Sequence, residues 1–415
     1  MKLVKLFLSY VSINIINASI PFFLLPILTT YLTPTDYGTL TNIDVIIRFT
    51  LPFILLGVNG AINTAYFRNE RHTFPAYFKS GISINLIASI LITCIFFVFS
   101  NFLNKITKVP QIWLLIIPTY CLLQSITTIC QSLFQMQKKA VNYGIFLISL
   151  TIINFTVSIL FVVVFKYNWQ GRISGILISY IILSIVSLVY FNQKKLLSSS
   201  YNKEYINDIL KFGIPLIPHL ISGPLVQFSD RLFITHYSGL SNAGIYNVAY
   251  QIGTVINLIT VGFNQAFVPY LYEKLKNIDL SGKKRIVKQS YALMLGYLIM
   301  AIMLWIVSPF IFKIFINSRY WEAQNYILPI ALGSSFGGMY LLVTNYIFYT
   351  KKTYLLTIAT ISNGLTSVFL NSILVRKYGA QGAAITFMIS NFLIFISVWI
   401  ISSRIYKMPW IKKIQ

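Results

Sequence analysis

Apolar runs of about 20 residues recur with little interruption from Phe7 to Ile401, and this is the length that an α-helix needs to cross the hydrocarbon core of a bilayer. The alternating pattern of about ten residues that marks an outer-membrane barrel is absent. We therefore expect an all-α membrane protein. About twelve transmembrane helices are predicted, near residues 7–32, 43–67, 77–102, 112–135, 141–165, 173–191, 212–236, 244–271, 291–315, 327–349, 354–375 and 383–401.

A polar segment divides this series of helices into two halves. Residues 193–211 contain three consecutive serines and mixed charges, and we interpret them as a cytoplasmic linker between bundles formed by residues 1–192 and 212–415. A short motif recurs between the halves, because Lys166–Gly171 (KYNWQG) is similar to Lys377–Gly382 (KYGAQG). Self-similarity of this kind indicates an internal duplication. Two sets of six helices in the same order predict a parallel repeat.

Composition supports a protein that lies within lipid. Hydrophobic residues make up 56% of the chain and charged residues only 10%, whereas soluble proteins carry about 25% charged residues. The net charge of +24 would suggest a nucleic-acid partner in a soluble protein. Here 23 of the 33 Lys and Arg residues lie on the same side as the N-terminus and 8 on the other. This bias predicts that both termini are cytoplasmic, and we expect no nucleic-acid partner. The basic loop 272–289 is expected to contact membrane lipids.

Charged residues inside expected spans are candidates for function, because they are costly in lipid. Asp44 and Arg48 are four residues apart and can pair on one helix face. Arg48 then faces either a wet cavity or a packing partner. Asp230 and Arg231 are adjacent and diverge by about 100° on a helix, so we expect them not to pair with each other. Both arginines have guanidinium groups suited to phosphate recognition, and Arg231 could instead lie at headgroups near the outer mouth.

Neutral residues offer a second kind of contact. Gln124 and Gln131, with Gln135, are spaced along one face of the fourth expected helix. Their amides could hold helices together or bind the hydroxyl groups of a sugar.

Prolines interrupt two expected spans. They are Pro21 and Pro26 in the first span and Pro215 and Pro218 at the start of the seventh. A proline removes a helix hydrogen bond, which membrane helices tolerate where neighbours or water satisfy the free carbonyl. Each proline is therefore either a gating hinge or a structural kink.

The chain shows no pattern typical of an enzyme, a metal site or a cofactor site. Its three His residues are scattered, and no Gly-Lys-Ser phosphate loop or Gly-x-Ser-x-Gly motif occurs. The three Cys residues lie inside expected spans and are interpreted as small buried apolar residues. Without an ATP-binding motif, transport would be facilitated or driven by an ion gradient. Asp44 and Asp230 are the acids inside expected spans and so the candidates for ion coupling.

Several motifs, taken in order, resemble a known family. They are Leu32–Gly38 (LTPTDYG), whose Pro, Asp and Gly also favour a tight turn, Phe212–Leu216 (FGIPL), Asp230–Ile234 (DRLFI) and Gly244–Tyr250 (GIYNVAY). Together with chain length and span number, they resemble the Wzx-type polysaccharide or O-antigen flippases of the multidrug/oligosaccharidyl-lipid/polysaccharide exporter superfamily. The similarity extends over essentially the whole chain.

This resemblance implies a MATE-like pair of six-helix bundles around a cationic cavity. It also implies translocation of an undecaprenyl-diphosphate-linked oligosaccharide across the bacterial inner membrane for O-antigen, capsule or another surface polysaccharide. Alternating access would be coupled to a monovalent cation, either proton or sodium, and glycan polymerase machinery could be a partner. Arg48 would be a cavity arginine. Asp230 and Arg231 would either bind substrate or hold the bundle together.

Three other functions are considered. A multidrug or cation antiporter of the same superfamily should present cavity acids, and Asp44 and Asp230 are the only two inside expected spans. A membrane glycan polymerase or ligase needs a large outside loop with catalytic residues, whereas the outside loops expected here are short. A peptidoglycan-precursor flippase has two additional spans.

Overall fold

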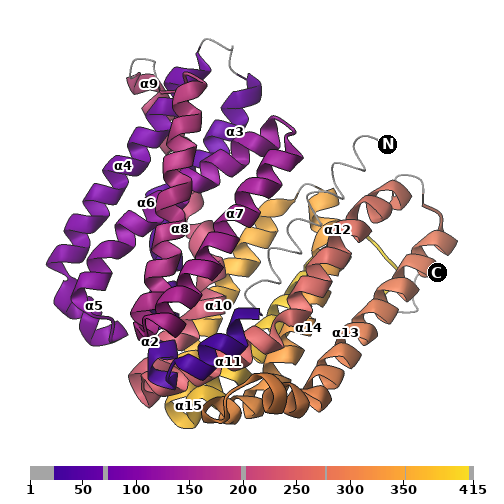
Figure 1. Ribbon diagram of the computed structural model, residues 1–415. Helices are drawn as coiled ribbons and strands as arrows, with labels where there is room; N and C mark the ends of the chain where they lie inside the picture. The colour runs from indigo at the N-terminus through magenta and orange to yellow at the C-terminus, as the bar shows by residue number, and fades with distance from the viewer. Residues whose placement is uncertain (1–22, 69–72, 198–201, 276–277, 351, 411–415) are drawn as a thin grey trace. The chain divides into compact units, whose positions relative to one another are not determined.

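The computed structural model describes residues 23–68, 73–197, 202–275, 278–350 and 352–410 (Figure 1). Throughout these residues the chain forms helices and no strands, which confirms the all-α prediction. The chain divides into two compact units, Met1–Pro224 and Leu225–Gln415, called unit 1 and unit 2. The division falls within helix α10 (Ile217–Ser238).

Among the described residues, eight helices are long and apolar enough to cross a membrane, or nine if one bent pair counts as a single span. Two features account for part of the difference from about twelve. The first expected span lies mostly within residues 1–22, which are outside the described part of the chain. The last two expected spans are the two helices of α15 (Thr353–Ile405), which meet at a kink at Gly379 and count once among the eight.

Unit 1 is built from consecutive helices joined by short connections. They are α2 (Pro34–Leu55), α3 (Val58–Arg68), α4 (Phe74–Val98), α5 (Ser100–Thr107), α6 (Gln111–Met136), α7 (Ala140–Ile159), η1 (Leu160–Val164), α8 (Asn168–Gln193), α9 (Lys203–Gly213) and η2 (Ile214–Leu216). Helix α6 is central, because it packs against α2, α4 and α8.

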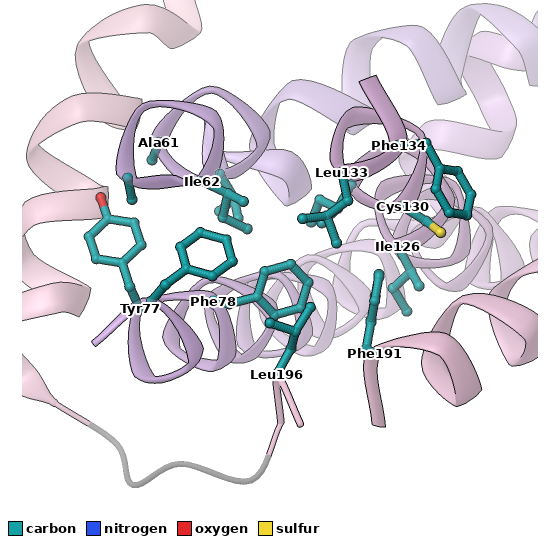
Figure 2. Close-up of a cluster of buried hydrophobic side chains, with 14 of the residues drawn as sticks. Ala61, Ile62, Tyr77, Phe78, Ile126, Cys130, Leu133, Phe134, Phe191 and Leu196 are labelled. Carbon is teal, nitrogen blue, oxygen red and sulfur yellow. The ribbon is translucent and has the colours of Figure 1, made fainter. Parts of the chain in front are cut away.

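A core cluster of unit 1 joins residues that are far apart in the sequence (Figure 2). The rings of Phe78 and Phe191 meet edge to face with centroids 4.8 Å apart, and neither side chain is exposed. Leu133 and Cys130 contribute to the same cluster from α6. Cys121 is also buried, but Cys94 is exposed, so the prediction that all three cysteines are buried was wrong for Cys94.

Helix α2 begins at Pro34, within the segment Leu32–Gly38 that was expected to form a tight turn. Thr33 and Asp36 form a capping box, in which the Asp36 N–H donates to Thr33 Oγ1 at 3.1 Å and the Thr33 N–H donates to Asp36 Oδ2 at 3.0 Å. This arrangement satisfies N–H groups that have no partner within the helix. Pro34 therefore starts the helix, and the turn is confined to the residues before it.

A break between α2 and α3 brings two glycines together. Leu56 and Gly57 have φ values of 46° and 67°, which end α2 and leave carbonyls near its end without helix partners. The buried Asn85 amide, oriented with its oxygen toward Ser125, donates to the carbonyl of Ile54 at 3.1 Å. A Cβ on Gly57 would lie 2.9 Å from the Cα of Gly213, so this crossing requires glycine on both segments.

Helix α9 lies within the segment expected to be a linker. Its Ile209 is fully buried, and the Tyr77 hydroxyl of α4 donates to Asp208 at 2.7 Å. Residues 203–211 of that segment therefore pack as part of unit 1.

Two of the four prolines lie near a bend between helical segments. Pro215 is in η2, Pro218 lies at the start of α10, and the two helical segments on either side are bent by 43°. The carbonyl of Pro26 accepts from the Thr30 hydroxyl at 2.9 Å. Pro21 is outside the described residues. Their roles as hinges stay predictions.

Unit 2 is organised around α14 (Gln324–Tyr349), which packs against the helices on either side of it in the sequence and against two earlier ones. Its other elements are the rest of α10, α11 (Leu240–Gly253), α12 (Val255–Leu275), α13 (Leu280–Phe315), η3 (Ser318–Ala323) and α15. Small residues allow close packing in such bundles. A Cβ on Gly333 would lie 2.6 Å from the Phe387 ring of α15.

The duplicated motif shares two backbone features in both units. Asn168 has φ 49° and its counterpart Gly379 has φ 56°, a positive φ that Asn and Gly tolerate better than other residues. A Cβ on the glycine three residues later would overlap preceding backbone, at Phe161 for Gly171 and at Leu374 for Gly382. The two turns differ elsewhere, because Lys166 also has a positive φ and Gly379 has a ψ of −138°.

Candidate functional site

The ion pair expected on α2 is formed. Arg48 Nε lies 2.8 Å from Asp44 Oδ2, and the two side chains are 47% and 50% exposed. Helix α2 is one of the candidate membrane spans. An ion pair within a span that remains half exposed is expected to face water or a ligand, because charged groups avoid hydrocarbon.

Two tyrosines of unit 1 lie near this pair. The rings of Tyr120 on α6 and Tyr180 on α8 meet edge to face with centroids 5.1 Å apart. Tyr180 is within electrostatic range of Arg48, and Tyr120 is within range of Asp44. Their hydroxyl groups therefore add neutral hydrogen-bonding groups beside the charged pair.

A second arginine joins the same region of unit 1. Arg172 lies near the start of α8, and its Nη1 donates to Ser158 Oγ of α7 at 2.7 Å and to the amide oxygen of Asn154. It is also within electrostatic range of Asp44 and Tyr120. We name Asp44, Arg48, Tyr120, Arg172 and Tyr180 the cationic cluster. The charged members of this cluster are two arginines and one aspartate, so its formal charge is positive.

The glutamines of α6 lie close to the cationic cluster along the helix. Gln124 is one turn from Tyr120, and Gln131 is two turns further along. The amide oxygen of Gln124 is buried and has no hydrogen-bond partner among the described residues. Gln131 is partly buried on the same helix.

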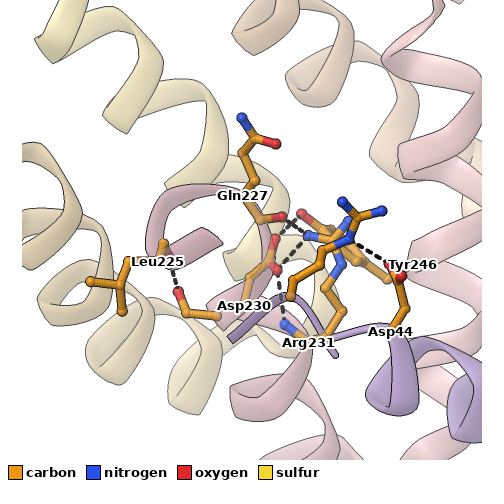
Figure 3. A network of polar contacts seen from close by, with 8 residues as sticks. Asp44, Leu225, Gln227, Asp230, Arg231 and Tyr246 are labelled. Carbon is orange, nitrogen blue, oxygen red and sulfur yellow. Dashed lines mark hydrogen bonds and ion pairs between the residues drawn. The ribbon is translucent and has the colours of Figure 1, made fainter. Parts of the chain in front are cut away.

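The second pair of charged residues, Asp230 and Arg231 in unit 2, is buried (Figure 3). Asp230 Oδ1 lies 2.6 Å from Arg231 Nη1, and the Tyr246 hydroxyl of α11 donates to Asp230 Oδ2 at 2.6 Å. The Arg231 side chain has no exposed surface and that of Asp230 has 3%. The prediction that these neighbours do not pair was wrong.

The reason is the reach of the arginine side chain. Arg231 folds back along α10, and its Nη1 also donates to the carbonyl of Gln227 one turn earlier. Side-chain length thus overcomes the angular separation of adjacent helix positions.

Aromatic rings complete the surroundings of Arg231. Its guanidinium carbon lies 3.9 Å from the ring centroid of Tyr250 and 5.1 Å from that of Phe228. Nε and Nη2 have no hydrogen-bond partner among the described residues, and contact with ring faces provides favourable electrostatics for such a cation. A substrate could reach Arg231 only if this network opened.

Sequence reasoning missed Arg172, Tyr120, Tyr180 and Tyr246. We expected Arg172 in an outside loop, just before the span at residues 173–191. It lies instead in the first turns of α8, which begins at Asn168. Nothing local to the tyrosines distinguishes them, because their roles depend on contacts between helices.

No group of three or more His, Cys, Asp or Glu side chains that could hold a metal ion occurs within the described ranges. His72 is outside them, and the side chain of His219 is not described.

Residues 3–275 match the family model described as "Polysaccharide biosynthesis protein". This chain belongs to that family. Among relatives of this polysaccharide biosynthesis protein, "Lsg locus putative protein 1" of Haemophilus influenzae is 26% identical over 366 residues, covering 86% of this chain and 87% of the relative. "Capsular polysaccharide biosynthesis protein CapF" of Staphylococcus aureus is 24% identical over 410 residues, covering 95% and 97%.

Solved structures show the fold of this polysaccharide biosynthesis protein. An inward-facing multidrug resistance MATE family transporter of the MOP superfamily matches with a TM-score of 0.78 at 12% identity, covering 94% of each chain. The lipid II flippase MurJ, in an inward closed conformation, matches with a TM-score of 0.68 at 16% identity, covering 93% of this chain and 87% of MurJ. The fold is therefore MATE-like, as expected, and the chain is a multi-pass membrane protein.

We predict that Arg231→Leu destabilises the protein by about 3–5 kcal/mol, because it leaves the buried Asp230 carboxylate without its cation. Tyr246→Phe should cost about 1.5–3 kcal/mol, since it removes one hydrogen bond to a charged group. Thermal unfolding of the purified protein in detergent measures both. Arg404→Leu is the matched control, because Arg404 is exposed near the end of α15. Equal unfolding midpoints for Arg231→Leu and Arg404→Leu would contradict the assignment.

Proposed function

We propose that this protein is a flippase that translocates undecaprenyl-diphosphate-linked oligosaccharide repeat units across the bacterial inner membrane for surface polysaccharide assembly. The observation that carries the proposal is the cationic cluster, in which the half-exposed Arg48 lies within a membrane span and pairs with Asp44, and Arg172 lies within electrostatic range of the same aspartate. The proposed topology has both termini in the cytoplasm, as the distribution of basic residues favours.

The charge of the cluster fits a diphosphate. A diphosphate cannot cross hydrocarbon unaided, because removing its hydration is very costly. Guanidinium groups replace that hydration well, since they bind phosphate oxygens with two parallel hydrogen bonds. Arg48 donates its Nε–H to Asp44, and its side chain is 47% exposed, so a phosphate oxygen can approach its guanidinium group.

Neutral groups beside the cluster fit the sugar part of such a substrate. We propose that Gln124 and Gln131 contact its hydroxyl groups, because Gln124 has a buried amide oxygen that no described residue satisfies. An amide that lacks a protein partner contributes little to helix packing, so the alternative role of holding helices together is less favoured for Gln124.

The family supports this substrate class. One similar structure is named a lipid II flippase, and CapF is named a capsular polysaccharide biosynthesis protein. Because the structural matches share little sequence, they support the fold, and the substrate remains our proposal.

A multidrug or cation antiporter is the second candidate, since the first structure cited is named a multidrug resistance transporter. A cationic drug would be repelled by the excess of arginine in the cationic cluster. The buried Asp230 is already neutralised by Arg231. A polymerase or ligase is supported by neither the family nor the structural matches.

The function is tested in a strain that lacks the gene. We expect loss of surface glycan and accumulation of undecaprenyl-linked repeat units inside the cell, both reversed by the wild-type gene. Unchanged glycan together with altered sensitivity to cationic drugs would instead indicate the antiporter.

For Arg48 we predict that Arg48→Ala lowers translocation in proteoliposomes by about 10- to 100-fold, the equivalent of one charge-assisted hydrogen-bonding group at about 1.5–3 kcal/mol. Arg48→Lys should retain part of the rate, because lysine keeps the charge and loses the planar fork. Arg404→Ala serves as the control. If Arg48→Ala translocates at the wild-type rate at equal protein amounts, Arg48 is only a packing partner of Asp44.

For Gln124 we predict that Gln124→Leu reduces translocation several-fold without lowering the unfolding temperature. The reason is that its amide oxygen has no protein hydrogen bond to lose, whereas a bound sugar would lose one worth about 0.5–1.5 kcal/mol. Parallel transport and thermal unfolding measurements decide this. A drop in unfolding temperature with unchanged transport would assign Gln124 to helix packing.

We also propose that a proton or sodium gradient drives transport through Asp44, the half-exposed carboxylate of the cationic cluster. An imposed gradient should accelerate the wild type, and Asp44→Asn should abolish that acceleration because it cannot bind or release the ion. Glu273→Gln, at the exposed end of α12, should respond like the wild type. Gradient stimulation that persists in Asp44→Asn would exclude this role. Asp230 is the weaker candidate, since Arg231 and Tyr246 already occupy both of its oxygens.

A further inference from the structure

A separate cavity lies entirely within unit 2, between α13, α14 and the start of the second arm of α15. Its volume is about 690 Å³, which falls within the range of about 300–1,000 Å³ typical of small-molecule sites. Pro309 is six residues before Phe315, where α13 ends, and this spacing is roughly 9 Å along a helix. The proposed topology places this end at the outer face of the membrane.

The chemistry of this cavity differs from that of the cationic cluster, because its lining residues include no Lys, Arg, Asp or Glu. Three carboxamides line it, from Gln324, Asn325 and Gln381, together with the Ser308 hydroxyl. Trp305 lies at its edge and is 47% exposed. Such a lining offers no positive charge to an anionic phosphate. It suits a neutral ligand.

One side-chain hydrogen-bond acceptor of this cavity has no partner among the described residues. The amide oxygen of Gln381 is buried and has no hydrogen-bond partner among the described residues. Pro329 lacks an N–H and therefore cannot donate to the carbonyl of Asn325, four residues earlier in the helix. On α13, Pro309 likewise lacks the N–H that would donate to the carbonyl of Trp305, four residues earlier. That carbonyl accepts a hydrogen bond from the Ser308 hydroxyl at 2.8 Å.

Each of these features favours a ligand that supplies several hydroxyl donors and has an apolar ring face. Unsatisfied buried acceptors are costly, so a donor-rich ligand gains by entering. An indole ring offers a flat apolar surface together with a polar N–H, which suits a position at the membrane boundary.

We propose that this cavity is a second binding site for carbohydrate, which holds neutral sugars of the repeat unit at the outer face. This proposal rests on the proposed function for its substrate class. The cationic cluster then binds the diphosphate, and the cavity of unit 2 recognises the glycan.

The chain provides a matched control through its duplication. Gln381 occupies the same position in its motif as Gln170 does in the motif before α8, with a glycine following in each case. Gln170 is exposed, whereas the Gln381 amide oxygen is buried in the cavity wall. Gln170→Leu therefore makes the same chemical change at an equivalent turn without altering the cavity.

The probe is the free repeat-unit oligosaccharide released by mild acid from the lipid-linked pool of the host. It carries neither the diphosphate nor the prenyl chain. Binding to the wild type, Gln381→Leu and Gln170→Leu is measured by calorimetry in nanodiscs of defined phospholipid, and Asn325→Leu provides a second variant of the cavity. Translocation of the lipid-linked form is measured on the same preparations in proteoliposomes.

We expect saturable binding to the wild type and to Gln170→Leu, and binding about two- to tenfold weaker to Gln381→Leu, the effect of losing one hydrogen bond of about 0.5–1.5 kcal/mol. Equal binding by Gln381→Leu and the wild type would overturn the proposal, because the glycan would then bind outside this cavity. The transport measurement judges the flippase function separately. A wild type that translocates the lipid-linked form but does not bind the free glycan refutes only the second site.

Discussion

The charges inside the membrane spans constrain this structure more than any other feature, because each must have a partner or water. The two units meet the constraint in opposite ways. In unit 1, Asp44 and Arg48 pair at 2.8 Å and stay about half exposed. In unit 2, Asp230 and Arg231 pair at 2.6 Å and are closed off by Tyr246 and by aromatic rings. The same two residue types therefore form an accessible site in one unit and a buried structural contact in the other.

The sequence predicts one of these pairs and not the other for a geometrical reason. Residues four apart share a helix face, so the period of the helix alone predicts the Asp44–Arg48 contact. The Asp230–Arg231 contact depends on the length of the arginine side chain and on Tyr246, which comes from another helix. Arg172 was missed for a similar reason, because its partners Asn154 and Ser158 lie on α7. Contacts between helices cannot be read from local spacing.

The fold itself was largely predictable, because hydrocarbon forces the backbone to satisfy its hydrogen bonds within helices. Hydropathy could not predict the residues at which helices begin or bend. The capping box at Thr33 starts α2 at Pro34, and the kink at Gly379 determines where the two helices of α15 meet. Helix α9 was interpreted as linker because it is polar overall, yet its apolar face covers the core of unit 1.

The duplication explains how one chain can carry two different chemistries. Asn168 and Gly379 both have a positive φ, and the glycine three residues after each packs against preceding backbone, so the two turns share these features. The side chains around them have diverged. Near the start of α8, Arg172 adds charge to the cationic cluster, whereas at the matching turn Gln381 contributes a neutral amide to a cavity without charged residues. A substrate that combines a diphosphate with a neutral glycan needs both environments, and a duplicated fold can provide them without compromising either.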